Sequence, residues 1–301
     1  MENYARKVSV VVPFYNAEKF IFDAVFSILK QSLTDFELLA VDDGSTDTTS
    51  AIIEGFGDSR IKLLTLENNK GNYFARNHGM SVAQGEYICV LDADDIALPY
   101  RLAKQVDFLD EFSSIGVIVS NYIIVNEHGK EISKRILPST PSKLNVILLR
   151  NNFILHSSLM FRSKIVHECG YYYDETLPYS ADYDFLSRLA NSFEIACLPE
   201  FLSCYRCHGN QISKTKATLQ RNIADNIRKK QFIKWGILDN SNLEILNRFM
   251  TDEPLYKWEV ELVIKLLHKI LQKDIKTQVF DHEYFIEYFQ KCCDSIKLIQ
   301  E

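Results

Sequence analysis

Glycine and proline are scarce in this sequence of 301 residues, with 11 and 7 copies. That scarcity excludes collagen-like and low-complexity chains. No stretch approaches the ~18 consecutive apolar residues of a membrane-spanning helix, and the first residues lack the basic-then-apolar pattern of a signal peptide. The seven cysteines are scattered, as is typical of reduced thiols in the cytosol. With a net charge of −6, we expect a cytoplasmic globular protein without a nucleic-acid partner.

The few helix-breaking residues are concentrated in the first part of the chain. Residues 216–301 contain one glycine, Gly236, and one proline, Pro254. We therefore predict a helical segment there and a first domain at 1–215. Within the helical segment, five apolar residues fall on one face of a helix. They are Val263, Leu266, Leu267, Ile270 and Leu271. This face indicates either packing against the first domain or contact with a membrane surface or a second copy of the chain.

The first hundred residues alternate between two kinds of pattern. Apolar runs rich in β-branched residues predict strands at 8–12, 36–41, 61–66 and 86–91. The segments between them predict helices at 16–31, with Asn16 as its cap, at 46–56 and at 72–83. Strands with little polar alternation are buried on both faces, as in a parallel sheet between helices. The sequence therefore predicts an α/β fold with a mostly parallel central sheet flanked by helices.

Polar side chains follow three of the predicted strands, at the point where each strand ends. They are Tyr15-Asn16, Asp42-Asp43 and the run from Asp92 to Asp95. Ligands bind at the carboxyl ends of the strands in such sheets. No glycine-rich phosphate loop is present, so carboxylates at this edge would hold a diphosphate only through a divalent cation, Mg²⁺ or Mn²⁺. Asp43, Asp47 and Asp95 are also typical of turn and helix-capping residues.

Six short motifs occur in a fixed order along residues 7–110. They are Val-Val-Pro-Phe-Tyr-Asn-Ala-Glu (11–18), Val-Asp-Asp-Gly-Ser-Thr-Asp (41–47), Asn-Lys-Gly (69–71), Ala-Arg-Asn-His-Gly (75–79), Ala-Gln-Gly-Glu-Tyr (83–87) and Leu-Asp-Ala-Asp-Asp (91–95). Together they resemble the donor-binding half of the family 2 glycosyltransferases, which have the GT-A fold. The resemblance continues more loosely to about residue 213. It divides the first domain into a donor half, 1–110, and an acceptor half, 111–215.

The resemblance implies a nucleotide-sugar donor, usually a UDP-sugar, and a divalent cation, Mn²⁺ or Mg²⁺. The residues that would bind the donor are Pro13, Tyr15, Glu18, Asp42, Arg76 and Asp92. Among them, Asp42 would hydrogen-bond the base and Arg76 would lie near the base or the diphosphate. Asp92 and Asp94 match the DxD motif of the family, with Asp94 as the direct metal ligand.

Inverting transfer also needs a base that takes the proton of the acceptor hydroxyl. The segment around Asp182 resembles the family's Glu-Asp motif and aligns Asp182 with the catalytic aspartate. The preceding glutamate is replaced here by Ala181, a departure that leaves the base in place. Asp184 is a second carboxylate on the same predicted helix, typical of a first-turn residue that stabilises the helix dipole.

The segment Cys204-Tyr205-Arg206-Cys207-His208 has two interpretations. CxxCH is a haem-attachment signal, which we reject for a chain without a signal peptide, and zinc binding would need a second cysteine pair. The segment also resembles the family's Tyr-Arg-x-His, in which the histidine lies near the diphosphate or the metal. His208 is therefore a candidate metal ligand. His156 begins a pattern common near the acceptor side of the family, and its role stays open.

The sequence thus predicts an inverting, metal-dependent glycosyltransferase of the hexosyltransferase type. Its acceptor would be a glycan or a lipid-linked glycan in bacterial surface polysaccharide synthesis. Such an acceptor makes contact with the inner face of the membrane plausible, through the helices of 216–301. Two alternatives remain: a sugar-nucleotide-binding scaffold that has lost activity, which Ala181 would indicate, and a nucleotidyltransferase, which would require an early glycine-rich basic loop.

Overall fold

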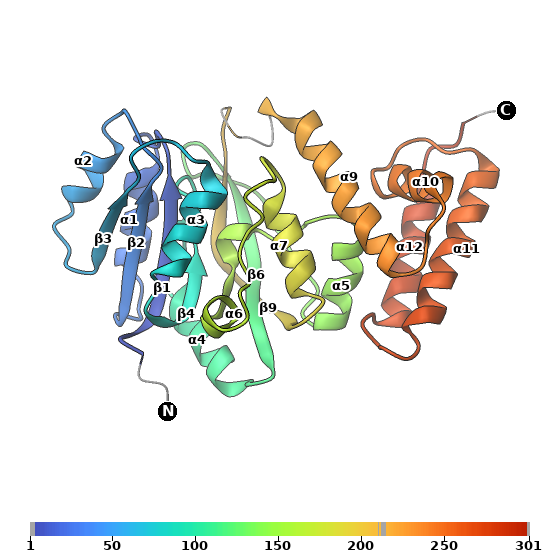
Figure 1. Ribbon diagram of the computed structural model, residues 1–301, viewed down its shortest axis with the longest axis horizontal. Helices are drawn as coiled ribbons and strands as arrows, with labels where there is room; N and C mark the ends of the chain where they lie inside the picture. Colours follow the sequence, from blue (N-terminus) through green and yellow to red (C-terminus); the bar gives the residue numbers. More distant parts are fainter. Residues whose placement is uncertain (1–3, 210, 212–214, 300–301) are drawn as a thin grey trace. The chain divides into compact units, whose positions relative to one another are not determined.

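A computed structural model describes residues 4–209, 211 and 215–299 of the chain. The chain forms two compact units, coloured by position along the sequence in Figure 1. Unit 1 consists of Met1–Ser139 and Ile154–Thr215, and unit 2 of Thr140–Phe153 and Lys216–Glu301. The sequence indicated a boundary near residue 215. The structure differs in one respect, because Thr140–Phe153 belongs to the helical unit although it lies within the predicted acceptor half.

Unit 1 is built on one nine-stranded sheet. Its strands are β1 (Arg6–Phe14), β2 (Phe36–Asp42), β3 (Ile61–Thr65), β4 (Gly85–Val90), β5 (Ile96–Ala97), β6 (Ile115–Asn126), β7 (Glu131–Arg135), β8 (Met160–Arg162) and β9 (Glu194–Cys207). The order is β3-β2-β1-β4-β8-β6-β9-β5, with β7 beside β6. The parallel arrangement is confirmed for β3, β2, β1 and β4. Beyond β4 the sheet is mixed, since β8, β7 and β5 run antiparallel to their neighbours.

Helices cover the sheet of unit 1 on both faces. They are α1 (Ile21–Leu29), α2 (Thr49–Glu54), α3 (Asn72–Ser81), α4 (Arg101–Glu111), α6 (Lys164–His167) and α7 (Ala181–Leu189), with a 3-10 turn, η1, at His156–Ser158. α1 and α4 share a core with Val8, Val10 and Val12 of β1. α3 packs against Val11 of β1 and Val41 of β2 (Figure 1). Alternate residues of β1 therefore face different helices, which explains why this strand is apolar throughout.

The close approach of α3 to the sheet depends on Gly79. A Cβ atom at this position would lie 2.6 Å from Cγ1 of Val11 and 3.0 Å from Cγ2 of Val41. Because a larger residue would push the helix away from the sheet, only glycine fits here. Arg76 lies three residues earlier in α3, on the same side of the helix. Gly79 thus sets how closely Arg76 approaches the edge of the sheet.

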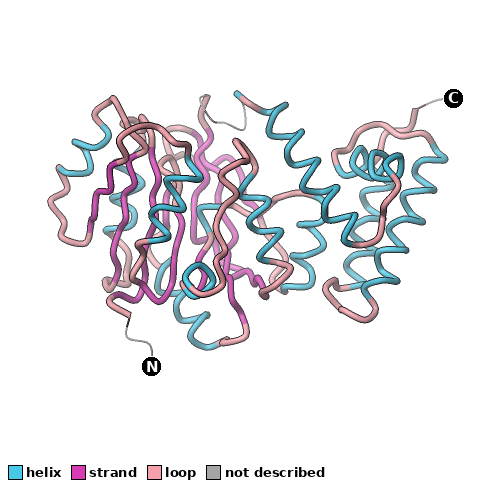
Figure 2. The backbone as a smooth tube through the Cα atoms, in the orientation of Figure 1, coloured by secondary structure: helices cyan, strands magenta, loops and turns pink. Residues whose placement is uncertain are grey.

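Unit 2 consists of helices and loops (Figure 2). The helices are α5 (Pro141–Arg150), α9 (Ala217–Lys234), α10 (Asn240–Met250), α11 (Lys257–Asp274) and α12 (His282–Ser295). The helical prediction for 216–301 is confirmed. The five residues of the predicted apolar face all lie in α11, where they belong to the core of unit 2 and are at most 8% exposed. Packing within unit 2 therefore occupies that face. Contact of these helices with a membrane or a second copy stays a prediction and would use other side chains.

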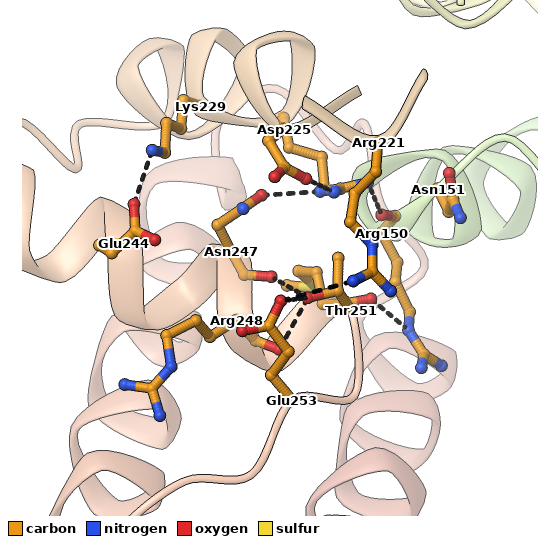
Figure 3. A network of polar contacts seen from close by, with 12 residues as sticks. Arg150, Asn151, Arg221, Asp225, Lys229, Glu244, Asn247, Arg248, Thr251 and Glu253 are labelled. Carbon is orange, nitrogen blue, oxygen red and sulfur yellow. Dashed lines mark hydrogen bonds and ion pairs between the residues drawn. The ribbon is translucent and has the colours of Figure 1, made fainter. Parts of the chain in front are cut away.

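A network of polar contacts ties the helices of unit 2 together (Figure 3). Nζ of Lys229 on α9 donates to Glu244 on α10 at 2.7 Å. The hydroxyl of Thr251 donates to the carbonyl of Asn247 and to the carboxylate of Glu253, each at 3.1 Å. These contacts link α9 to α10 and hold the residues at the end of α10 in place. The network therefore stabilises the fold of this unit.

The start of α1 differs from the prediction. The sequence indicated a helix capped by Asn16, whereas α1 begins at Ile21. Asn16 instead lies in the left-handed backbone region, with φ of 49°, and its Oδ1 accepts a bond from the amide of Thr46 at 2.8 Å. An asparagine side chain can hydrogen-bond a neighbouring loop as readily as a helix end. Asn16 thus joins the loop after β1 to the loop after β2.

The cysteines behave as the sequence indicated. All seven are free thiols, and burial raises the pKa of Cys204 to about 11. Among the helices of the described residues, none is long and apolar enough to cross a membrane.

Candidate active site at the carboxyl edge of the sheet

The three predicted polar clusters lie at one edge of the sheet because β1, β2 and β4 are parallel neighbours. Phe14, the last residue of β1, pairs with Asp42, the last residue of β2. Val11 pairs with Val90 at the end of β4, and the amide of Leu91 donates to the carbonyl of Val11 at 3.1 Å. The loops that carry Tyr15, Asp42 and Asp92 therefore begin side by side.

Hydrogen bonds from η1 and β9 hold the Asp92–Asp95 loop in place. The amide of Asp95 donates to the carbonyl of Asp92 at 3.1 Å, which closes a turn. The amide of Asp92 donates to the hydroxyl of Ser157 in η1 at 3.0 Å. Arg206 of β9, which is 3% exposed, donates from its amide to Oδ1 of Asp95 and from Nε to the carbonyl of Asp94, each at 2.9 Å. Strand β9 thus fixes the orientation of the DxD segment.

Asp94 and His208 lie together at this loop. Nε2 of His208 is 2.9 Å from Oδ2 of Asp94, and its ring packs 4.6 Å from that of Phe20. Burial and the nearby carboxylate of Asp92 raise the pKa of Asp94, against the opposite effect of His208. A divalent cation would relieve this crowding of carboxylates. No cluster of three or more metal-binding side chains occurs in the described ranges. A cation held beside Asp94 would therefore need its other ligands from phosphate oxygens and water.

Arg76 and Asp92 form an ion pair at the same edge. The side chain of Arg76 is 2% exposed, and its Nε finds no hydrogen-bond acceptor within the described part of the chain. Burial lowers the pKa of Arg76, but Asp92 together with Tyr173, Tyr73 and Asp182 more than offsets this, so the pKa is raised and the charge is kept. The rings of Tyr173 and Tyr73 lie 5.3 and 5.9 Å from the guanidinium. A buried cation with an unused donor is suited to bind an anionic or carbonyl oxygen.

Asp42 and Asp43 organise the loop after β2. Oδ1 of Asp42 accepts from the amide of Ser45 at 2.7 Å, and Oδ2 accepts from the hydroxyl of Ser50. The carboxylate of Asp43 accepts from the amides of Lys70 and Gly71 at 2.7 and 2.9 Å. Asp43 therefore joins this loop to the residues that precede α3, a cross-link that the expected turn role did not anticipate.

The other predicted donor residues differ in exposure. Pro13 is buried within β1, whereas Tyr15 is 48% exposed just beyond the strand. Glu18 accepts from the hydroxyl and the amide of Thr48, at 2.7 and 3.2 Å, at the start of α2. Tyr15 and Glu18 are thus both exposed, and the Glu18 carboxylate is in addition used to hold a helix end.

Helix α7 begins at Ala181 after Ser180, whose φ is 57°. Asp182 lies in its first turn, close enough that its charge contributes to the raised pKa of Arg76 and, after burial, of Tyr73. Asp184 differs, because its Oδ2 accepts from Nε of Arg188 at 2.7 Å within the same helix. The structure thus brings Asp182 to the side chains of α3 and gives Asp184 an ion pair of its own.

Residues 9–170 match the sequence model described as Glycosyl transferase family 2. The chain belongs to this family. An uncharacterized glycosyltransferase of Methanocaldococcus jannaschii is 34% identical over 69% of this chain and 74% of its own length. A UDP-Glc:alpha-D-GlcNAc-diphosphoundecaprenol beta-1,3-glucosyltransferase of Escherichia coli is 40% identical over 43% of this chain and 50% of its own. The protein is accordingly a glycosyltransferase.

Solved structures share the fold of this family 2 enzyme. TarS 1-349 of S. aureus in complex with UDP-GlcNAc matches with a TM-score of 0.65 at 21% identity, over 96% of this chain and 91% of that one. A mannosyltransferase from Pyrobaculum calidifontis in complex with GDP-Man and Mn²⁺ matches with a TM-score of 0.60 at 15% identity, over 97% and 86%. The predicted fold class, with a GT-A-type sheet and C-terminal helices, is confirmed.

Three residues that hold the segments around this edge of the sheet gave little signal in the sequence. Arg206 lay within a motif chosen for its histidine, and Asn77 within one chosen for its arginine. Tyr173 belongs to a run of three tyrosines, Tyr171 to Tyr173, and this run matches no motif or periodic pattern. Each acts through contacts with residues about a hundred positions away, such as the bonds between Asn77 and Tyr173. Sequence patterns of short period cannot reveal contacts between residues so far apart in the chain.

Proposed function

We propose that this glycosyltransferase is an inverting, metal-dependent enzyme that transfers a sugar from a nucleotide-sugar donor, a UDP-sugar, to a hydroxyl of a glycan or lipid-linked acceptor. The observation that carries this proposal is the cluster at the Asp92–Asp95 loop, where the Asp94–His208 pair and the Arg76–Asp92 pair occur within one short segment. The complex of TarS with UDP-GlcNAc and the UDP-Glc specificity in the name of the E. coli relative support the donor class.

In this proposal the donor lies across the ends of β1, β2 and β4. Tyr15, half exposed at the edge, offers a ring for the nucleoside next to Pro13. Asp42 contacts the base with an acceptor lone pair that its bonds to Ser45 and Ser50 leave available. The unused Nε of Arg76 binds an oxygen of the base or the diphosphate.

The residues that would hold the cation are Asp94, His208 and Asp92. Mn²⁺ or Mg²⁺ would neutralise charge on the departing diphosphate. Nε2 of His208 orients Asp94 through their 2.9 Å contact and would exchange that contact for the cation when the cation binds. The Arg206 bonds hold the backbone of the loop, so the carboxylates need little rearrangement when the donor binds.

Asp182 would accept the proton of the acceptor hydroxyl as its oxygen attacks the anomeric carbon. A positioned base accelerates such a step by ~10²–10⁴-fold. Its charge lies near Arg76, as the pKa of that arginine reflects, so the base would lie beside a residue that binds the donor. Ala181, which replaces the family's glutamate, is fully buried. The smaller side chain therefore leaves no opening at the surface.

The acceptor would belong to bacterial surface polysaccharide synthesis. The diphosphoundecaprenol acceptor in the name of the E. coli relative and the teichuronic acid assignment of a Bacillus subtilis relative support that class. A lipid-linked acceptor would bring the enzyme to the inner face of the cytoplasmic membrane. The enzyme would then work in the cytoplasm as a peripheral protein.

A donor screen tests the proposed function. The purified protein is incubated with each common sugar nucleotide and a diphosphoundecaprenol-linked sugar, with Mn²⁺, with Mg²⁺ or with excess chelator, and released nucleoside diphosphate is measured. We expect turnover with one UDP-sugar that disappears with chelator and returns with added cation. Full activity in chelator would refute metal dependence. Binding of UDP without any turnover would favour the inactive sugar-nucleotide-binding scaffold.

A further inference from the structure

Tyr173 lies at the centre of unit 1, in the segment that connects α6 to α7, and is 3% exposed. Its backbone is held by the side chain of Asn77 in α3. The amide of Tyr173 donates to Oδ1 of Asn77 at 2.9 Å, and its carbonyl accepts from Nδ2 at 3.0 Å. Asn77 is the residue after Arg76. These two bonds therefore tie the segment that leads into α7 directly to the helix that carries Arg76.

The hydroxyl of Tyr173 makes a third connection. It lies 2.6 Å from Nε2 of His156 in η1, the turn whose Ser157 holds the amide of Asp92. His156 is 6% exposed, and its Nδ1 meets no partner among the residues that the structure describes. Burial lowers the pKa of His156 well below its usual range, so the ring is neutral. The bond to Tyr173 is thus its main polar anchor.

The ring of Tyr173 fills the space between two helices. It stacks on Phe185 of α7, with ring centres 4.2 Å apart and planes 25° apart. It also lies 5.9 Å from the ring of Tyr73 and 5.3 Å from the guanidinium of Arg76, both on α3. Phe185 follows Asp182 by three positions, on the same side of α7. The ring is therefore a spacer between Arg76 and the helix turn that carries Asp182.

We propose that Tyr173 is a positioning residue that fixes α7, and with it Asp182, relative to Arg76 and Asp92. His156 holds it in place through the hydroxyl. This role rests on the proposed function, because it assumes that Asp182 is the base. Tyr173 touches neither the donor nor the acceptor. Its effect on the reaction comes from geometry, and a displacement of about 1 Å in a catalytic group can cost up to ~10²-fold in rate.

The test compares Tyr173→Phe with Tyr171→Phe. Both remove one tyrosine hydroxyl from the same segment, and Tyr171 makes an equally short bond, 2.6 Å, to the hydroxyl of Ser192, away from the site. We expect Tyr173→Phe to lower kcat by about tenfold at saturating donor and acceptor, with less than a twofold change in calorimetric UDP affinity. Tyr171→Phe should change neither quantity. Tyr171→Phe should melt close to the unmodified protein, whereas Tyr173→Phe should melt at a lower temperature because buried His156 loses its polar anchor; both should remain folded at the assay temperature.

Variants of His156 complete the test. His156→Leu should lower kcat as Tyr173→Phe does, and the double variant should lose little more, because both changes break the same bond. His156→Gln, which can still hydrogen-bond the hydroxyl, should recover most of the rate. Equal kcat for Tyr173→Phe and Tyr171→Phe, or a loss of UDP affinity as large as that of kcat, would overturn the inference. Absence of turnover in the unmodified protein would instead reject the proposed function, and UDP affinity would still be measurable.

Discussion

Both units bury arginines almost completely, namely Arg76, Arg101 and Arg206 in unit 1 and Arg228 in unit 2. Arg76 and Arg228 differ in how far their donors are satisfied. Arg228 in unit 2 is 1% exposed. Its Nε donates to Asn247 at 2.9 Å, one terminal nitrogen to the carbonyl of Arg150 at 3.3 Å, and the other to Asp225; Asp225 and Asn247 are drawn in Figure 3. Arg76 in unit 1 is equally buried, but its Nε lacks a partner in the described residues.

The difference distinguishes structural charge from charge held ready for a ligand. Burying a cation is costly unless its donors are paired, so a fully bonded arginine serves the fold. A buried donor left unused is tolerated where a ligand later supplies the acceptor. Asp92, the partner of Arg76, is 32% exposed, so the pair is open on one side. Arg101 of α4 also has one terminal nitrogen without a partner among the described residues, so an unused donor alone does not mark a ligand site. We propose that the Arg76–Asp92 pair belongs to the site because Asp92 is also partly exposed, whereas the polar network of unit 2 is structural.

Two carboxylates of α7 differ in the groups that their charges act on, and this difference gives the largest expected effect. Asp184 has its own partner in Arg188, whereas the charge of Asp182 acts on Arg76 and two tyrosines. We expect Asp182→Asn to lower kcat by at least ~10²-fold, because the amide cannot accept the proton. UDP affinity should barely change. Kinetics at saturating donor and acceptor, with a melting curve, measure this.

Asp184→Asn is the matched control, since it makes the same change two positions along the helix. It should keep most of the activity and lose some stability through its weakened bond to Arg188. A folded and active Asp182→Asn variant would reject Asp182 as the base. Activity lost in Asp184→Asn instead would transfer the role to the second carboxylate.

Arg76 and Arg228 themselves provide the next test. Arg228→Met should reduce the free energy of unfolding by about 3 kcal/mol, because it leaves Asp225 and the buried Asn247 without their partner. Arg76→Met should reduce it by about 1 kcal/mol, since Asp92 can regain water, but should weaken UDP binding about tenfold through the lost charge-assisted bond.

Denaturant unfolding and titration calorimetry, applied to both variants, separate the two effects. Arg228→Met should bind UDP normally at a temperature where it remains folded. If Arg76→Met bound UDP as tightly as the unmodified protein, the unused donor would have no part in the donor site, and the contrast between the two units would lose its meaning.

The sequence predicted the local features well and the long-range ones poorly. Strands β2 and β3 and helix α3 begin at the predicted residues. Their signals, the spacing of apolar residues and the polar residues at the loop ends, depend on positions close together in the sequence. His208 was a candidate ligand, but its contact with Asp94 joins positions 114 apart. The assignment of Thr140–Phe153 to unit 2 was missed for a related reason. Its helix α5 is ordinary in composition, and only tertiary packing decides which core it joins.

The smallest expected effect concerns Asp42, whose carboxylate combines the two kinds of role in one residue. Its oxygens hold Ser45 and Ser50, as a structural residue would, yet the proposed function also has it contact the base. Asp42→Ala should therefore reduce both the free energy of unfolding and the affinity for UDP.

Ser50→Ala separates the two roles, since it removes the hydroxyl bond to Oδ2 of Asp42 and leaves the carboxylate in place. We expect it to reduce the free energy of unfolding by about 1.5 kcal/mol, the range for a hydrogen bond to a charged group, with UDP affinity changed less than twofold. Asp42→Ala should lose at least as much stability and bind UDP, and every UDP-sugar, about tenfold more weakly. Denaturant unfolding and calorimetry of both variants measure this.

Equal UDP affinity in the two variants would show that Asp42, like Arg228, serves only the fold, and the base would then be recognised by another residue of the edge. A loss confined to one sugar would contradict a contact with the base, because that contact is the same for every UDP-sugar.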